Sequence, residues 1–229
     1  MKKTTRKLIT LISIIMITFP AGSVLAKIWE GDYTIVTSDD ISALSGYTVV
    51  SGNLKIVSSY TLKNLRGLEN IANVGGSLEI LNNTSLTSLT GLENIASVGG
   101  NFWIESNGNL KSLSVLSNIT SVGGGVIIAR NATLTDLSGL ENITSIGAFL
   151  IIDDNKSLTN LNAFSNVTSM GENLYIINNL SLTSLTGLEK ITLSGRNLII
   201  SGNDSLTGRT SCIIKKTNNL KAKYKLSCL

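Results

Sequence analysis

Few residue patterns in this 229-residue chain are typical of a catalytic site. The sequence contains no histidine, the commonest base that activates a cysteine or serine nucleophile. It also has no phosphate-binding loop and no cluster of residues at metal-ligand spacing. We therefore expect no enzymatic activity, no cofactor and no metal ion.

One place in the repeat brings several acids and a base together. The 24-residue repeat of the chain sets Asp153 and Asp154 near Arg130 and Glu105 in neighbouring coils. Clustered acids with a basic partner occur in lyases built on parallel β-solenoids, and they can also form a weak cation site. An ordinary charged edge has the same composition, and we favour that interpretation.

Apolar residues at fixed steps define the elements that must position every other side chain. Two columns, two residues apart, recur every 24 residues, and no insertion interrupts them between residues 54 and 207. The first column is Leu54, Leu78, Phe102, Val126, Leu150, Leu174 and Leu198, and the second is Ile56, Ile80, Ile104, Ile128, Ile152, Ile176 and Ile200.

Within each unit further apolar residues recur every third position, as in Leu86, Leu89, Leu92 and Ile95. This step fits neither an α-helix nor plain strand alternation, and we expect short strand segments separated by bends. One coil cannot bury its own leucines, so the coils must stack. The sequence therefore predicts an all-β solenoid, a right-handed parallel stack of leucine-rich coils with strands about 4.8 Å apart.

A polar column supports this stacking. Six asparagines and one serine hold the same place in successive units: Ser59, Asn83, Asn107, Asn131, Asn155, Asn179 and Asn203. Buried amides are tolerated where each finds hydrogen-bond partners, so we predict a structural asparagine ladder. Five ladder members match the N-glycosylation pattern but could not carry a glycan, and Asn118, Asn142 and Asn166 are the more exposed candidates.

The chain begins with the three-part pattern of a bacterial-type signal peptide. Lys2, Lys3, Arg6 and Lys7 precede an apolar stretch from Leu8 to Phe19, and small residues precede Lys27. We expect cleavage after Ala26, export, and no membrane span after cleavage, because the stretch is shorter than the roughly 20 residues a bilayer needs. Without the signal, 15 basic residues balance 15 acidic ones, which argues against binding to nucleic acid.

The ends of the predicted solenoid differ from its middle. We assign residues 1–26 to the signal peptide, 27–53 to a degenerate first coil or cap, 54–208 to six full repeats and a partial seventh, and 209–229 to a basic C-terminal cap. Cys212 and Cys228 are the only cysteines, and in an exported chain we expect them to form a disulfide in that cap.

The unit (G)xLxIxxNxxLxxLxxLxxIxxVGG resembles the receptor L-domain branch of the leucine-rich repeats. The lead-in IVTSDDISALSGYTVVSGNLKI is also similar to the start of such domains, and the resemblance covers about residues 31–207. Members occur in receptor ectodomains, fungal cell-wall glycoproteins and exported bacterial proteins. The resemblance thus implies a binding or structural role outside the cell, although this chain lacks the many cysteines of the receptors.

The residues between the two inward columns must face outward. From residue 103 on they are large and apolar, and we call this column the apolar stripe: Trp103, Ile127, Ile151, Tyr175 and Ile199. Phe149, Leu81 and Ile177 should lie beside it. A stripe of this size exceeds the apolar patch of an ordinary monomer. We interpret it as a face that binds a protein or glycan partner. The alternatives are self-association, a terminal segment folded over it, or simply residues that favour β-structure on a partly exposed strand.

A second outward surface carries hydroxyl groups. Pairs such as Thr133 and Thr135, or Ser157 and Thr159, flank an inward leucine in each coil, and Asn109 and Lys111 interrupt the array. Such arrays resemble the ice-binding faces of some β-solenoids, which gives an alternative function. The favoured hypothesis is an exported recognition or adhesion module, secreted or at the cell surface, with the periplasm as another location.

Overall fold

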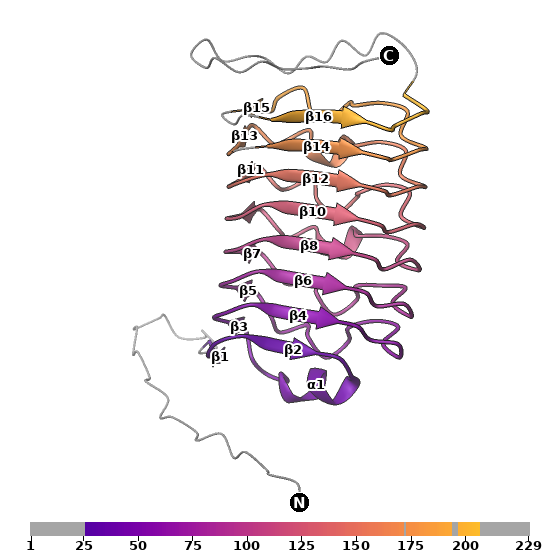
Figure 1. Ribbon diagram of the computed structural model, residues 1–229. Coiled ribbons are helices and arrows are strands. Elements are labelled where there is room, and N and C mark those ends of the chain that lie inside the picture. The colour runs from indigo at the N-terminus through magenta and orange to yellow at the C-terminus, as the bar shows by residue number, and fades with distance from the viewer. Residues whose placement is uncertain (1–25, 172, 194–196, 207–229) are drawn as a thin grey trace, which may run out of the picture.

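The computed structural model describes residues 26–171, 173–193 and 197–206 as a stack of coils, one above the other (Figure 1). The predicted signal peptide, the basic cap and both cysteines lie outside the described residues, except for Ala26. Each complete coil supplies one four-residue strand and one two-residue strand, and each kind forms its own parallel sheet of eight strands. The predicted all-β solenoid is confirmed.

The four-residue strands, with a three-residue strand at the N-terminal edge, form what we call the main sheet. They are β2 (Tyr33–Ile35), β4 (Leu54–Val57), β6 (Leu78–Leu81), β8 (Phe102–Glu105), β10 (Val126–Ala129), β12 (Leu150–Asp153), β14 (Leu174–Ile177) and β16 (Leu198–Ser201).

The two-residue strands form the short sheet. They are β1 (Ile28–Trp29), β3 (Val49–Val50), β5 (Asn73–Val74), β7 (Ser97–Val98), β9 (Ser121–Val122), β11 (Ser145–Ile146), β13 (Ser169–Met170) and β15 (Thr192–Leu193).

The main sheet keeps the 24-residue register from β4 to β16. Leu54 pairs with Leu78, and Leu174 pairs with Leu198. The two inward columns are buried, at no more than 8% exposure in any coil. Stacking identical positions thus builds one continuous core from residues that a single coil would leave in water.

The segments with apolar residues at every third position are turns, and the expectation of short strands there is wrong. In these segments the N–H of Leu92 donates to the carbonyl of Leu89, and that of Ile95 to the carbonyl of Leu92. Two of them tighten into 3-10 turns, η1 (Ser114–Leu116) and η2 (Asn162–Phe164). A turn of three residues has the period of the pattern, so each apolar side chain returns to the same inward side.

The expectation of an unbroken register fails at β15. Thr192 pairs with Ser169, and Leu193 pairs with Met170, a step of 23 residues. The usual step would place Leu193 at the outward position of Ser169 instead. Leu193 therefore takes the register position of Met170 and not that of Ser169.

Two columns of glycine allow the coils to stack closely. A Cβ at Gly147 would lie 1.8 Å from the carbonyl oxygen of Gly123, and one at Gly124 would lie 2.3 Å from Oδ1 of Asn101. Neither position could hold a side chain without moving the backbone of the preceding coil. The repeated Gly-Gly pair therefore serves the architecture.

A short helix covers the N-terminal end of the core. In α1 (Ser38–Ala43), Ile41 is buried against the first coil. Oδ2 of Asp40 accepts hydrogen bonds from the N–H groups of Val36 and Thr37, at 3.0 and 2.8 Å. These bonds hold the pKa of Asp40 below its ordinary value of 3.8.

Candidate binding face on the main sheet

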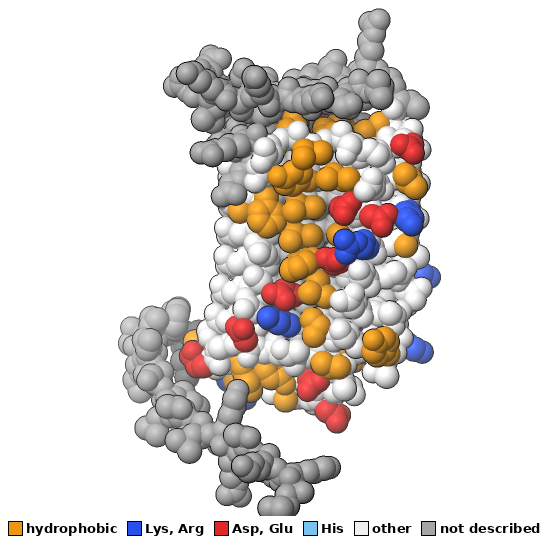
Figure 2. Space-filling view, viewed as in Figure 1, with side chains coloured by type: hydrophobic (Ala, Val, Ile, Leu, Met, Phe, Trp, Pro, Cys, Tyr) orange, Lys and Arg blue, Asp and Glu red, His pale blue; other side chains and the backbone are white. Residues whose placement is uncertain are grey.

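The apolar stripe runs straight along the outward side of the main sheet. Its members are direct partners on adjacent strands: Trp103 pairs with Ile127, Ile127 with Ile151, Ile151 with Tyr175, and Tyr175 with Ile199. Each covers part of its neighbours, so all are half-buried except Ile199, which is 42% exposed. Figure 2 shows hydrophobic side chains in a band along this face, with acidic and basic groups at its edge.

The flanking columns place the other predicted members at the stripe. Leu81 and Ile177 are half-buried in the next outward column, two residues along their strands. The ring of Phe149 lies over Gly125, where an added Cβ would come within 2.2 Å of the ring. Towards the N-terminus the stripe gives way to an ion pair between Lys55 and Glu79, at 3.9 Å between Nζ and Oε2.

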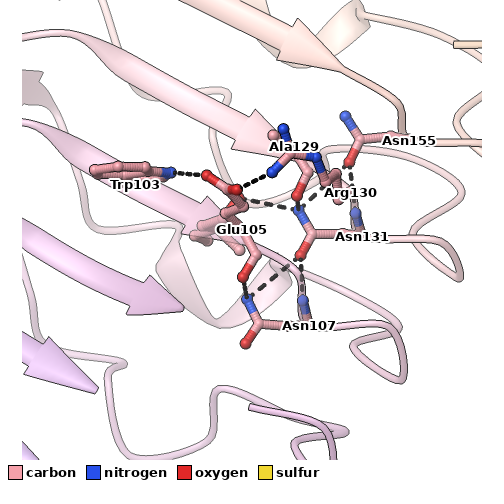
Figure 3. Close-up of polar contacts among 8 residues, drawn as sticks. Trp103, Glu105, Asn107, Ala129, Arg130, Asn131 and Asn155 are labelled. Atoms are coloured by element: carbon pink, nitrogen blue, oxygen red, sulfur yellow. Dashed lines mark hydrogen bonds and ion pairs between the residues drawn. The ribbon is translucent and has the colours of Figure 1, made fainter. Parts of the chain in front are cut away.

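Trp103 is fixed by a polar arrangement that the sequence did not reveal (Figure 3). Its indole N–H donates to Oε2 of Glu105 at 2.7 Å. The other carboxylate oxygen of Glu105 accepts from the guanidinium of Arg130, which is the residue after β10. The ring therefore has one defined orientation, which lowers the entropic cost of using it in a contact.

Asp153 and Asp154 do not join this arrangement. Within the described residues neither has an ion pair or a side-chain hydrogen bond, and Oδ1 of Asp153 is buried without a partner. The described part of the chain also holds no group of three residues suited to bind a metal ion. Of the four residues predicted to cluster, Glu105 and Arg130 form an ion pair, whereas Asp153 and Asp154 form none within the described residues.

The asparagine ladder lies directly behind this face. Its amides are 0% exposed from Asn83 to Asn179, and 8% at Asn203. In each coil Oδ1 accepts a hydrogen bond from the backbone N–H of the preceding ladder residue. For example, the N–H of Asn107 donates to Oδ1 of Asn131 at 3.1 Å. The Nδ2 group donates to a carbonyl 27 residues earlier, as from Asn131 to Ile104 at 3.0 Å.

The residue before each ladder member has left-handed backbone geometry, which sequence analysis missed. The φ values lie between 51° and 58° at Ser58, Asn82, Ser106, Arg130, Asp154 and Asn178. This turn ends each main-sheet strand and points the next side chain inward. The available signal was the recurrence of Ser, Asn and Asp, which tolerate this region better than most residues.

A second polar ladder occupies the first coils, and it was not predicted from the sequence. Oδ1 of Asn53 accepts the N–H of Ser77 at 2.7 Å, Oγ of Ser77 accepts that of Asn101 at 3.0 Å, and Oδ1 of Asn101 accepts that of Gly125 at 2.8 Å. Gly125 ends this ladder, and Phe149 occupies the same position in the coil after it. The change from polar to apolar on this edge occurs beside the stripe.

The Gly-Leu-Glu-Asn segments are architectural. The carboxylate of Glu93 accepts the N–H of Gly91 at 2.8 Å, and Glu141 does the same for Gly139 at 2.7 Å. The amides of Asn118, Asn142 and Asn166 donate to carbonyls of the preceding coil, at 2.7 to 2.9 Å. These three asparagines are exposed, but each already uses its amide within the fold.

The hydroxyl columns lie on turns, outside both sheets. Oγ1 of Thr159 donates to the carbonyl of Thr135 at 3.0 Å, and Thr183 donates to Thr159 at 3.1 Å. Their hydroxyl protons therefore bind the protein itself. This use of the hydroxyl groups weakens the ice-binding hypothesis.

The short sheet carries a shallow groove of about 670 Å³. Its lining repeats the glycines that stacking requires, with outward serines such as Ser97, Ser121 and Ser145. The groove follows from the absence of side chains at the glycine positions, and we assign it no role.

Comparison with known families identifies the class of protein. The family model for the receptor L domain matches residues 47–135 and 96–219, which together span well over half of the chain. The chain belongs to the receptor L-domain family, a family of binding domains typical of extracellular proteins. A search of curated proteins gave no match. None of the helices in the described residues is long and apolar enough to cross a membrane.

Proposed function

We propose that this protein is an extracellular recognition module that binds a protein or glycan partner through the apolar stripe. The observation that carries the proposal is the stripe itself: five consecutive coils present a large apolar side chain at one outward position. Outward columns of a water-exposed sheet are normally polar. A stripe of this length is the kind of surface that partners bury.

Membership of a family of binding domains supports a binding role in general. The fixed ring of Trp103 supports this surface in particular, because oriented aromatic residues are frequent anchors of interfaces. Secretion or attachment at the cell surface is part of the proposal, and self-association through the stripe is the alternative use of the same residues.

The test replaces Trp103 and Tyr175 together with serine. We expect this variant to lose its partner in pull-downs from the surface fraction of the source cells, and to keep its far-UV circular dichroism. Size-exclusion chromatography of the wild type decides between a foreign partner and self-association. Thr159→Lys on the hydroxyl columns is the control. Unchanged binding and unchanged oligomer size in the double variant would refute the role of the stripe.

A further inference from the structure

The charges beside the apolar stripe are unevenly compensated. Glu79 faces Lys55, and Glu105 faces both Arg130 and the indole of Trp103. Within the described residues, Asp153 and Asp154 have neither a basic partner nor a side-chain hydrogen bond. The middle of the stripe, on β12, therefore has an uncompensated acidic edge.

Asp153 lies where a partner on the stripe would meet it. It shares the outward side of β12 with Ile151, and its neighbours on adjacent strands are Ala129 and Ile177. Its side chain is half-buried, and its Oδ1 atom lacks a hydrogen-bond donor in the described structure. A carboxylate oxygen in this position is stabilised when a bound group donates to it.

The surroundings decide which donor fits. A metal ion needs several oxygen ligands, and no group of three candidate ligands exists in the described residues. The apolar neighbours favour a cation carried on an apolar stem, as lysine and arginine are.

We infer that the partner is a polypeptide segment that sets a lysine or arginine among apolar side chains, with the cation at Asp153 and the apolar groups on the stripe. The inference rests on the proposed function and narrows its partner from protein or glycan to a basic, apolar polypeptide. A neutral glycan brings no cation to Asp153, and an acidic segment would be repelled there.

The test uses two synthetic ten-residue peptides, one in which leucine alternates with lysine and one in which leucine alternates with glutamate. Binding to the full chain is measured by fluorescence anisotropy. We expect the lysine peptide to bind and the glutamate peptide to fail. Asp153→Asn, which keeps the shape of the side chain, should weaken the lysine peptide about tenfold or more, as expected for loss of a charged hydrogen bond.

Asp39→Asn is the matched control, because it removes the same charge from an exposed position on α1. It should leave the affinity within about twofold, since exposed charges far from a contact are screened. Thermal midpoints of both variants exclude unfolding as the cause of a loss.

Three outcomes would overturn the inference. Equal binding of the lysine peptide to wild type and Asp153→Asn would show that the carboxylate is not used. Equal binding of both peptides would leave the stripe as a purely apolar site, and binding of a neutral oligosaccharide alone would assign the face to glycans. In each case the Trp103 and Tyr175 double variant still tests the proposed function separately.

Discussion

Replacing Asn131 with alanine tests the ladder that holds the binding face in place. Asn131 is 0% exposed and lies between two main-sheet coils. Its Oδ1 accepts the N–H of Asn107 at 3.1 Å, and its Nδ2 donates to the carbonyls of Ile104 and Ala129, each at 3.0 Å. Alanine removes all of these partners at once, and water cannot replace them in a buried site.

The expected loss follows from these contacts. The N–H of Asn107 is left without its acceptor, which costs about 1–3 kcal/mol for a buried group. The lost amide bonds to carbonyls contribute about 1 kcal/mol more. Ala129 is less affected, because its carbonyl also accepts from the N–H of Ser106 at 3.0 Å. We expect the free energy of unfolding to fall by about 2–4 kcal/mol.

Equilibrium unfolding in urea, followed by far-UV circular dichroism, measures this loss. Asn70→Ala is the control, because Asn70 is exposed and lies outside the ladder. It should change the free energy of unfolding by no more than about 0.5 kcal/mol. If Asn131→Ala were as mild as Asn70→Ala, the argument that stacked amides hold the coils together would be refuted.

Three further predictions concern backbone and pH. Gly147→Ala should lower the free energy of unfolding by about 1–3 kcal/mol or more, because its Cβ would lie 1.8 Å from a carbonyl oxygen of the preceding coil. Gly108→Ala is the control and should be tolerated, because an added Cβ there has no neighbouring atom within 4 Å. Chemical denaturation compares the two variants, and equal effects would contradict the stacking account. At Ser58, where φ is 54°, the Ser58→Val variant should have a free energy of unfolding about 1–2 kcal/mol lower than the Ser58→Gly variant. The urea midpoints of the two variants measure this difference. A more stable valine variant would contradict the left-handed geometry. Hydrogen bonds hold the pKa of Asp40 below 3.8 in the folded protein, so the stability that its carboxylate contributes is present above that value and is lost as the pH falls through the lowered pKa. Asp40→Asn should therefore flatten the fall in thermal midpoint below about pH 4. An unchanged slope would count against a stabilising role of the Asp40 carboxylate.

The repeat made most of the fold predictable. Because every coil uses the same positions, seven copies of Leu54 and Ile56 fixed the register of the main sheet, and the buried asparagines identified a third column. The step of three residues was ambiguous, since turns and short strands both return a side chain inward at that interval. The 23-residue step at β15 was not predicted, because a shift by one residue in one coil is a weak signal against a regular repeat.

The site was predictable only where it depends on strand alternation. Alternation placed Trp103 and Tyr175 outward, but it says nothing about side-chain rotamers. The bond from Trp103 to Glu105 joins residues two apart, while the pairing of Glu105 with Arg130 crosses between coils. The sequence grouped Arg130 with three charged neighbours, and only the conformation of its side chain determines that it binds Glu105 and not Asp153.

The most direct test of the proposed function compares partner retention by two variants of equal stability. Wild type, the Trp103 and Tyr175 double serine variant, and Thr159→Lys are each immobilised and exposed to the same surface extract. We predict that the partner captured by wild type is lost at least about tenfold in the double serine variant and is retained by Thr159→Lys. Retention by the double variant, or loss only with Thr159→Lys, would contradict a binding face on the main sheet.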